Sequence, residues 1–341
     1  MDQTLQPLST GAGVMLIAAV TAFFVGMVLA PAVIGLMRRL KAGQTILSYV
    51  DQHRDKQGIP TCGGWIFLIA STVATLAFGG WKSRMCLVAL AVFFAYGVIG
   101  FLDDFIKIRF HRNLGLRAYQ KILSQLAVAV IAALFAAKHL YVGTTITLPL
   151  VGTQWEMGYL FYPFAVIVFL AMSNGVNLTD GLDGLAATTG SVYMIGYGGI
   201  FLLAFLEAAE SGDVLLQAEL RGMLLFLGAI VGGLGAFLWH NAPKATVFMG
   251  DTGSLALGGA AAAVAIFSRN PLISILIGIM FVVSCISVIV QVIVFKLRKK
   301  RVFLMAPFHH HLELKGFAES KIVAFYGLAT AVATAVAWLI V

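Results

Sequence analysis

The sequence predicts an all-α protein that crosses a membrane many times. Of its 341 residues, 60% are hydrophobic and only 11% are charged, whereas about 25% of the residues in a soluble domain are charged. Apolar runs of about twenty residues, the length that spans the hydrocarbon core of a bilayer, recur along the whole chain. No long polar tract interrupts them, so residues 1–341 are expected to form one integral membrane domain.

About ten apolar segments are candidate transmembrane helices. Their expected extents are 12–37, 60–80, 85–102, 118–137, 159–176, 186–206, 221–240, 253–268, 272–295 and 321–341. The first run follows no basic segment and exceeds the apolar part of a signal peptide, so it is expected to remain as a span. Residues 142–158 combine Thr/Ile alternation with proline and glycines, which predicts a small β-hairpin in a loop.

The basic residues predict the orientation of the spans. If the N-terminus lies outside, most of the 23 Lys and Arg residues fall in loops on the inner side, as the positive-inside rule requires. An even number of spans then places both termini and the hairpin outside. The net charge of +8 is explained by this topology, so it does not indicate a nucleic-acid partner.

The third span ends in a pair of carboxylates, Asp103 and Asp104, followed by Lys107. On a helix the lysine lies three and four residues beyond the acids, so it can pair with either of them. An unpaired carboxylate is costly at a membrane boundary, which favours a functional role. The alternative is a simple stop-transfer boundary with a local salt bridge.

A second polar group follows the fifth span, where Asn174, Asn177, Asp180 and Asp183 recur every three residues. On a helical or 3₁₀-like path these side chains would form one polar stripe. The alternative is an ordinary polar loop, since Asn, Asp and Gly are common in loops. The regular spacing favours a binding site.

The segment FMGDTGS, which begins at Phe248, opens the eighth span. Thr252 or Ser254 is expected to cap this helix, whose free amides would also attract phosphate. Asp251 is a candidate Mg²⁺ ligand. The alternative is that Asp251 only stabilises the helix dipole.

Three consecutive histidines, His309, His310 and His311, precede the last span. Consecutive helical side chains point in different directions and cannot all bind one metal, so a zinc site is not expected. Imidazoles can instead donate hydrogen bonds to phosphate oxygens or move a proton. The alternative is a solvated basic loop. Lys56, before the second span, is expected either to contact a phosphate or to act only as an orientation charge.

Together these groups predict phosphoryl transfer at the inner face of the membrane. Carboxylates and phosphate oxygens are the ligands that Mg²⁺ prefers, and Mg²⁺ with basic groups around a diphosphate is typical of such transfer. The chain has no GxxxxGK(S/T) segment, which disfavours an ATPase. A site at the lipid boundary suggests one water-soluble and one lipidic substrate.

The chain resembles the polyprenyl-phosphate N-acetylhexosamine-1-phosphate transferases. The resemblance is carried, in order, by KQGIPTCGG at Lys56, DDFIK at Asp103, NLTDGLDGL at Asn177, FMGDTGSL at Phe248 and PFHHHLELKG at Pro307. It covers nearly the whole chain, and the unbroken histidine segment favours the branch that uses a muramoyl-pentapeptide donor.

The resemblance implies a reaction between UDP-MurNAc-pentapeptide and undecaprenyl phosphate that gives lipid I and UMP. It implies Mg²⁺ as the cofactor, a bacterial inner membrane with a cytoplasmic active site and periplasmic termini and hairpin, and a ten-span fold that is often a homodimer. Asp251 would be a metal ligand and Asp180 a second one. Asp103 and Asp104 would handle the lipid phosphate, one of them as a base, with Lys107 beside them.

The remaining implied site residues would bind the substrates. Asn174, Asn177, Asp180 and Asp183 would belong to the nucleotide and metal region, and the histidines would contact the phospho-sugar, with His310 in a catalytic role. Other substrate-binding residues implied by the resemblance are Lys56, Lys121, Phe248 and Gln291.

The chain departs from the family pattern at two places. It has Ile59-Pro60-Thr61-Cys62 where the family usually has TPTM, and Tyr119-Gln120-Lys121 where the family usually has Lys-x-Lys. The missing lysine affects the details of nucleotide binding. Two alternative functions remain, a GlcNAc-1-phosphate transferase with the same motifs and a membrane transporter with intramembrane carboxylates.

Overall fold

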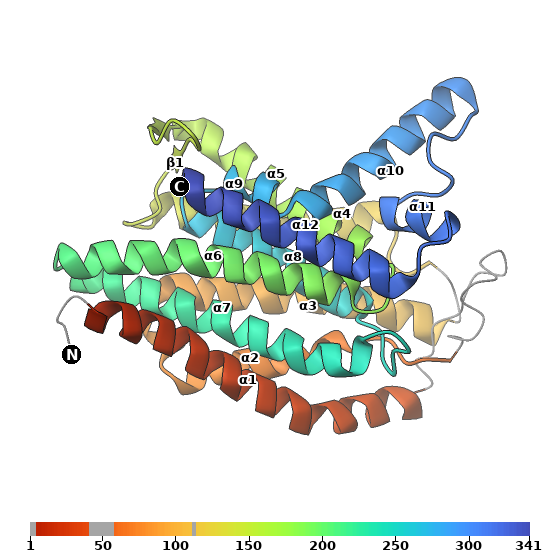
Figure 1. Ribbon diagram of the computed structural model, residues 1–341, viewed down its shortest axis with the longest axis horizontal. Coiled ribbons are helices and arrows are strands. Elements are labelled where there is room, and N and C mark those ends of the chain that lie inside the picture. Colours follow the sequence, from red (N-terminus) through yellow and green to blue (C-terminus); the bar gives the residue numbers. More distant parts are fainter. Residues whose placement is uncertain (1–4, 41–57, 111–113) are drawn as a thin grey trace.

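The computed structural model describes residues 5–40, 58–110 and 114–341. Its helices run back and forth along one axis in a single bundle, with one very small sheet at an end (Figure 1). The helices are α1 Leu5–Arg39, α2 Gly64–Ala77, α3 Arg84–Arg109, α4 Ala118–Lys138, α5 Phe161–Thr179, α6 Leu185–Glu210, α7 Val214–Asn241, α8 Gly250–Phe267, α9 Ile273–Ile277, α10 Ile279–Arg298, α11 Phe308–Leu314 and α12 Glu319–Ile340. Within the described residues, nine helices are long and apolar enough to cross a membrane. The predicted all-α polytopic class is therefore confirmed.

Two of the ten expected spans differ in detail. The segment expected at 60–80 contains α2, which has only 14 residues, about 21 Å of helix and less than the hydrocarbon thickness. The segment expected at 272–295 is divided at Gly278 into α9 and α10. A Cβ at Gly278 would lie 2.6 Å from the Ser274 carbonyl oxygen, so this bend requires a glycine. Beyond it, α10 leans away from the bundle (Figure 1).

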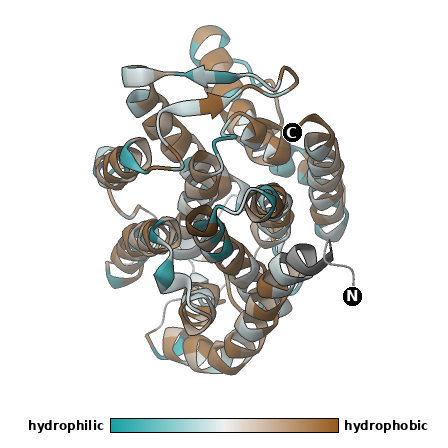
Figure 2. Ribbon diagram, turned by 90° about the vertical axis from the view of Figure 1, so that its left-hand side faces the viewer, coloured by the Kyte–Doolittle hydropathy of each residue, from teal (hydrophilic) through white to brown (hydrophobic). Residues whose placement is uncertain are grey.

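Both chain ends lie at the same end of the bundle (Figure 1). This placement is what an even number of passes produces. The hairpin strands, β1 Thr145–Thr147 and β2 Gln154–Glu156, pair antiparallel with Ile146 opposite Trp155, which confirms the expected hairpin. Viewed from this end, the hairpin crosses the rim of a bundle whose helices consist largely of hydrophobic residues (Figure 2). Which end faces the cytoplasm stays a prediction.

The centre of the bundle is α8. Of its apolar window, 89% is buried, compared with 22% for α1. Small residues permit this burial, because glycine lets neighbouring backbones approach closely in membrane bundles. A Cβ at Gly258 would lie 2.5 Å from Cα of Ser173 on α5, and one at Gly64 would lie 2.3 Å from Cα of Gly253. The first residues of α8 are thus surrounded by other helix ends.

Candidate active site

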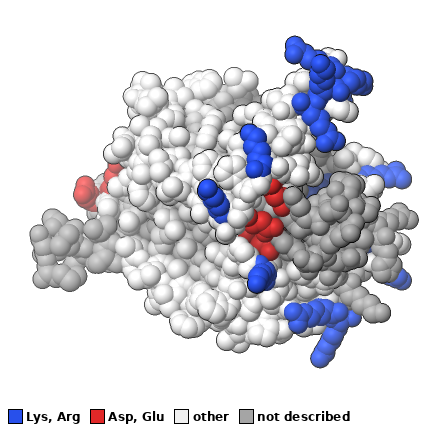
Figure 3. Space-filling model, turned by 45° about the vertical axis from the view of Figure 1, so that its right-hand side comes forward, with Lys and Arg blue, Asp and Glu red and all other residues white. Residues whose placement is uncertain are grey.

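Four helix ends meet at the end of the bundle opposite the termini. The last turns of α3 and α5 lie beside the first turns of α4 and α8, and each contributes polar side chains that contact those of another. Figure 3 shows acidic side chains gathered in one patch on this side of the molecule, with lysine and arginine side chains around it. The structure therefore joins motifs that lie far apart in the sequence.

Asp251, in the first turn of α8, lies at the middle of this patch. Its Oδ2 atom accepts from Lys107 Nζ at 2.9 Å and from Lys121 Nζ at 3.0 Å. Its Oδ1 atom accepts from Asn177 Nδ2 at 2.7 Å. Three helices other than α8 thus supply donors to one carboxylate. Asp251 is therefore connected to more helices than its own, and its functional role stays a prediction.

Asp103 and Lys107 form the pair that their spacing on α3 predicts. The Lys107 Nζ atom lies 2.6 Å from Asp103 Oδ2, while Asp103 Oδ1 accepts from the backbone N–H of Leu116 at 2.9 Å. Asp103 is buried. The lysine therefore connects Asp103 to Asp251, and the pair is more than a local boundary salt bridge.

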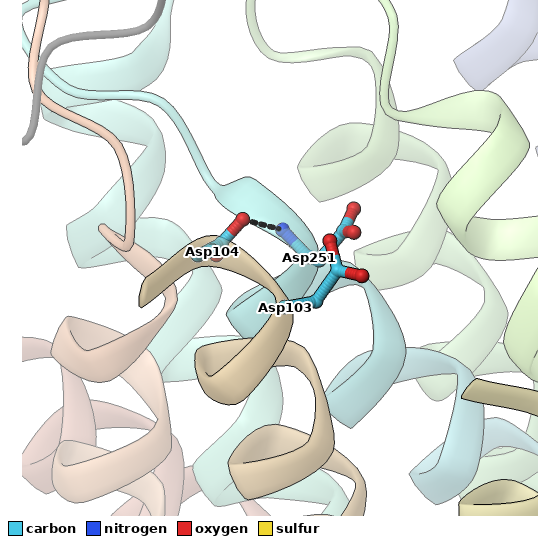
Figure 4. A group of neighbouring side chains, drawn as sticks. All are labelled: Asp103, Asp104 and Asp251. Carbon is cyan, nitrogen blue, oxygen red and sulfur yellow. Dashed lines mark hydrogen bonds between the residues drawn. The ribbon is translucent and has the colours of Figure 1, made fainter. Parts of the chain in front are cut away.

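Asp104 has a different role, because its carboxylate binds the beginning of α8. It accepts from the Asp251 N–H at 3.1 Å, which Figure 4 shows, from the Thr252 N–H at 2.9 Å and from the Thr252 hydroxyl at 2.7 Å. The Cys62 thiol, 3.6 Å away, also donates to it. Asp104 thus provides the negative charge at this helix N-terminus.

The expected cap of α8 by Thr252 or Ser254 is therefore wrong. Met249 is the N-cap residue and no side chain of the segment makes a capping bond, because a carboxylate from α3 takes the amides instead. Gly250 has φ of +71°, and a Cβ there would lie 2.5 Å from Asp104 Oδ2. Glycine is required at this position for both reasons.

Asp103, Asp104 and Asp251 are named here the carboxylate centre (Figure 4). One oxygen from each lies within 4.8 Å of the others, and no other group of His, Cys, Asp and Glu in the described part of the chain meets this criterion. Hard carboxylate oxygens gathered in this way fit Mg²⁺, which prefers oxygen ligands. Because Asp104 is already engaged by α8, Asp103 and Asp251 are the residues that fit such an ion best.

The second polar group does not form the single stripe that its spacing suggests. Asn177 contacts Asp251 and Ser254, whereas Asn174 donates to Gln125 Oε1 at 2.9 Å. Asp183 is buried and accepts from the Ala245 N–H at 3.2 Å, which places it under the loop before α8. Helix α5 ends at Thr179, so Asp180 and Asp183 no longer follow the helical spacing that would align them with the two asparagines.

Asp180, expected as a second metal ligand, is not part of the carboxylate centre. It is the first residue after α5 and is half-buried. Burial, together with the nearby Asp251 and Asp104 carboxylates, raises the pKa of Asp180 well above its usual value. The residue therefore lies within electrostatic reach of the centre without being one of its members.

Lys121 and Gln125 lie one turn apart on α4, and each contacts an asparagine of α5. Lys121 contacts Asn177 Oδ1 at 3.4 Å and Asp251, and Gln125 receives Asn174. Lys121 is thus present at the centre although its partner lysine in the family pattern is missing. Gln125, which is fully buried, was not predicted as a site residue. A glutamine four residues after a lysine within an apolar run was the available signal.

The three histidines lie on α11, and within the described part of the chain none of them belongs to the group formed by Asp103, Asp104 and Asp251. His310 Nδ1 lies 3.0 Å from Glu313 Oε2, and His311 Nδ1 accepts from the Leu304 N–H at 3.1 Å. His309 is fully buried, and among the described residues neither of its ring nitrogens has a hydrogen-bond partner. Burial, and then the neighbouring His310, lower the pKa of His309 to about 3. The ring packs so closely against Gly181 that a Cβ there would lie 2.2 Å from Nε2.

Two other predicted site residues, Gln291 and Phe248, hold loops in place. Gln291, on α10, accepts from the N–H groups of Val302 and Phe303 at 3.0 Å each, which fixes the loop before α11. Phe248 pairs through its backbone with Pro60 and Gly63 at 2.8 Å in both bonds, which joins the entries of α2 and α8. Lys56 lies outside the described residues.

The comparisons with known proteins agree with this geometry. Residues 86–269 match the model of glycosyl transferase family 4. The chain is 42% identical over 316 residues to the phospho-N-acetylmuramoyl-pentapeptide-transferase of Desulfitobacterium hafniense, covering 92% of this chain and 93% of the relative. It is 40% identical to the enzyme of the same name from Clostridium kluyveri, covering 95% of this chain and 98% of the relative.

A third relative of that name, from Halalkalibacterium halodurans, is 40% identical over 92% of this chain and 93% of its own length. The matched regions include every helix that contributes to the carboxylate centre, because they extend over nearly the whole chain. The chain therefore belongs to the phospho-N-acetylmuramoyl-pentapeptide-transferases of glycosyl transferase family 4.

Proposed function

We propose that the protein transfers phospho-MurNAc-pentapeptide from UDP-MurNAc-pentapeptide to undecaprenyl phosphate, which gives lipid I and UMP. The observation that carries this proposal is Asp251, at a helix N-terminus among apolar spans, where Lys107 and Lys121 contact one of its oxygens. Cationic groups beside carboxylates at the membrane boundary suit a reaction between a nucleotide diphosphate and a lipid phosphate. The relatives' shared name supports this choice of donor.

In the proposed reaction an oxygen of the lipid phosphate attacks the β-phosphorus of the donor. The bond from that phosphorus to the oxygen that bridges the two phosphates breaks, and its electron pair leaves with UMP. Lys107 and Lys121 would bind the phosphate oxygens and offset the negative charge that develops on the leaving UMP. The lipid phosphate is largely ionised near neutral pH, so a strong general base is not needed.

Asp103 and Asp251 would hold Mg²⁺, which supplies Lewis-acid stabilisation of the diphosphate when bound. Asp104 acts as a positioning residue, because its bonds to the Asp251 and Thr252 amides hold the start of α8 against α3. Asn177 would orient Asp251 through its 2.7 Å contact. We further propose Asp180 and the α11 histidines as contacts for the rest of the donor.

The location of the reaction is also part of the proposal. We place the protein in a bacterial inner membrane with the carboxylate centre facing the cytoplasm, because the last turns of α1, α3 and α10, at the same end of the bundle as the centre, carry basic residues. We also propose that it forms a homodimer, as the family resemblance implies. A membrane-impermeant maleimide should label a cysteine introduced at Lys300 in inside-out vesicles and leave it unlabelled in right-side-out vesicles. The reverse pattern would overturn the orientation.

The test of the reaction uses purified protein, undecaprenyl phosphate, Mg²⁺ and either UDP-MurNAc-pentapeptide or UDP-GlcNAc. UMP and a new lipid-linked sugar should form only from the muramoyl donor. EDTA or Asp251→Ala should lower the rate at least about 100-fold, while Lys138→Ala, at the other end of α4, should not. UMP from UDP-GlcNAc alone would place the protein with the GlcNAc-1-phosphate transferases. Absence of UMP from both donors, with folded protein, would favour the transporter alternative.

The role of Asp103 separates two mechanisms. Near-normal turnover by Asp103→Asn would exclude this side chain as base or nucleophile, would count against its proposed role as a Mg²⁺ ligand, and would support direct attack by the lipid phosphate. A phospho-sugar trapped covalently on Asp103 would instead establish a two-step route.

A further inference from the structure

Asp251 is the meeting point of two lysines from different helices. Lys107 comes from the end of α3 and Lys121 from the beginning of α4, and both donate to the same oxygen, Oδ2, at 2.9 and 3.0 Å. Asn177 donates to the other oxygen, Oδ1, at 2.7 Å. Both oxygens of the carboxylate therefore accept from groups of the chain itself, and Oδ2 accepts from two of them.

This engagement matters because Asp251 is also the best candidate metal ligand. A carboxylate oxygen has two lone-pair positions, and at Oδ2 both are used by ammonium groups. A divalent cation on the same oxygen would lie a few ångströms from two like charges, which repel it because Asp251 is only 16% exposed to water. The two lysines and a divalent cation therefore cannot occupy Oδ2 together.

We infer that Mg²⁺ and the two lysines exchange on Asp251, and that the exchange transfers the lysines to the donor's diphosphate. This inference rests on the proposed function. Binding of the cation frees two ammonium groups at the place where a diphosphate arrives, and a bound diphosphate draws the same groups away from Asp251. Metal and diphosphate therefore each strengthen the binding of the other, and this coupling is reciprocal by thermodynamic necessity.

The second contacts of the lysines keep them in the site during the exchange. Lys107 is also bound to Asp103 at 2.6 Å, and Lys121 lies 3.4 Å from Asn177 Oδ1. Their side chains are 33% and 17% exposed, so both reach the surface of the patch. A lysine released from Asp251 therefore turns toward a phosphate at the patch and stays attached to its neighbour.

The first arm of the test measures metal binding without turnover. Mn²⁺ binding to the full-length protein in detergent is followed by electron paramagnetic resonance in the absence of nucleotide. Lys121→Met should bind Mn²⁺ about tenfold more tightly than the wild type, because a charge-assisted competitor for Oδ2 has been removed. Lys138→Met, on the same helix but at its other end, is the matched control and should bind as the wild type does.

The second arm measures UDP as the diphosphate probe, in EDTA and in Mg²⁺, by calorimetry. The wild type should bind UDP at least tenfold more tightly with Mg²⁺. Asp251→Asn, in which the lysines are already free, should bind UDP in EDTA more tightly than the wild type does and gain little from Mg²⁺. Glu207→Gln, in the last turn of α6 at the opposite end of the bundle, removes an exposed carboxylate that has no part in the site, and it should retain the wild-type dependence on Mg²⁺.

The outcomes separate the exchange from the proposed function. Wild-type binding of both probes, with Mn²⁺ affinity unchanged in Lys121→Met, would overturn the exchange and leave the proposed function standing. The exchange would likewise be overturned, without loss of the proposed function, if Asp251→Asn binds UDP in EDTA no better than the wild type. If the folded wild type binds neither Mn²⁺ nor UDP, the proposed function and the exchange both fail.

Discussion

Replacing Gly100 by alanine is expected to remove most of the turnover without changing any polar group of the carboxylate centre. A Cβ at Gly100 would lie 2.0 Å from the backbone oxygen of Asp251, whereas real Cβ contacts essentially never fall below 3.0 Å. The obstructing atom belongs to the backbone and cannot rotate away, so α3 and α8 must separate by about 1 Å. Since α3 carries Asp103 and Lys107, a displacement of this size is expected to lower the rate about 100-fold.

Gly97→Ala, one turn earlier on the same face of α3, is the matched control. Its Cβ would meet the end of the flexible Leu68 side chain at 2.4 Å, and the next atom lies at 3.5 Å. This variant should keep the rate within about threefold of the wild type, because a rotamer change relieves the contact. Product formation and the melting temperature are measured for both variants. Equal losses of rate in the two variants, or near-normal turnover by Gly100→Ala, would refute the proposed dependence on the α3–α8 approach.

Three other substitutions test separate parts of the structure. Gln125→Leu removes the acceptor of Asn174, so the melting temperature should fall by the equivalent of about 1 kcal/mol and the rate should fall less than in Gly100→Ala; an unchanged melting temperature would contradict this. Glu219→Gln weakens the acceptor of the Ser83 hydroxyl and the first amides of α3, roughly 30 Å from the centre, so it should destabilise the protein by about 1 kcal/mol with normal kcat. His309 has a lowered pKa of about 3 and an unfolded value near 6.5. Between these values the unfolded chain binds more protons than the folded protein, so stability should decrease as pH falls below about 6.5, by at most about 1.4 kcal/mol per pH unit. The melting temperature of His309→Gln should therefore differ less between pH 7.5 and pH 5 than that of the wild type.

Apolar length predicts the spans well because each span must satisfy its own backbone hydrogen bonds in lipid. The predictions were least accurate where tertiary contacts override length. The helix expected at 60–80 begins only at Gly64, since Pro60 and Gly63 are held by backbone bonds to Phe248. The division of the ninth span at Gly278 depends on one glycine within an apolar run. Such glycines do not change the hydropathy pattern.

The chemistry of the site could be predicted from residue types, but its partners could not. The pairing of Asp103 with Lys107 follows from local helix spacing, and the structure confirms it. The contacts of Asp251 with Lys121 and Asn177 join residues 130 and 74 positions apart, which spacing alone cannot reveal. Asp104 illustrates the same limit. Its position beside Asp103 suggests that the two carboxylates share a role, but the main contacts of Asp104 are the amides at the start of α8.

The three carboxylates of the centre have different sets of partners, and this difference explains why they are not interchangeable. Asp104 is compensated by helix amides and a hydroxyl, which cannot leave. Asp103 is compensated by Lys107 and an amide. Asp251 is compensated only by side chains, two of them lysine ammonium groups, and it shares Lys107 with Asp103. A carboxylate whose counter-charges can move is the one able to accept a cation and return them, so exchangeable chemistry belongs at Asp251 and fixed structure at Asp104.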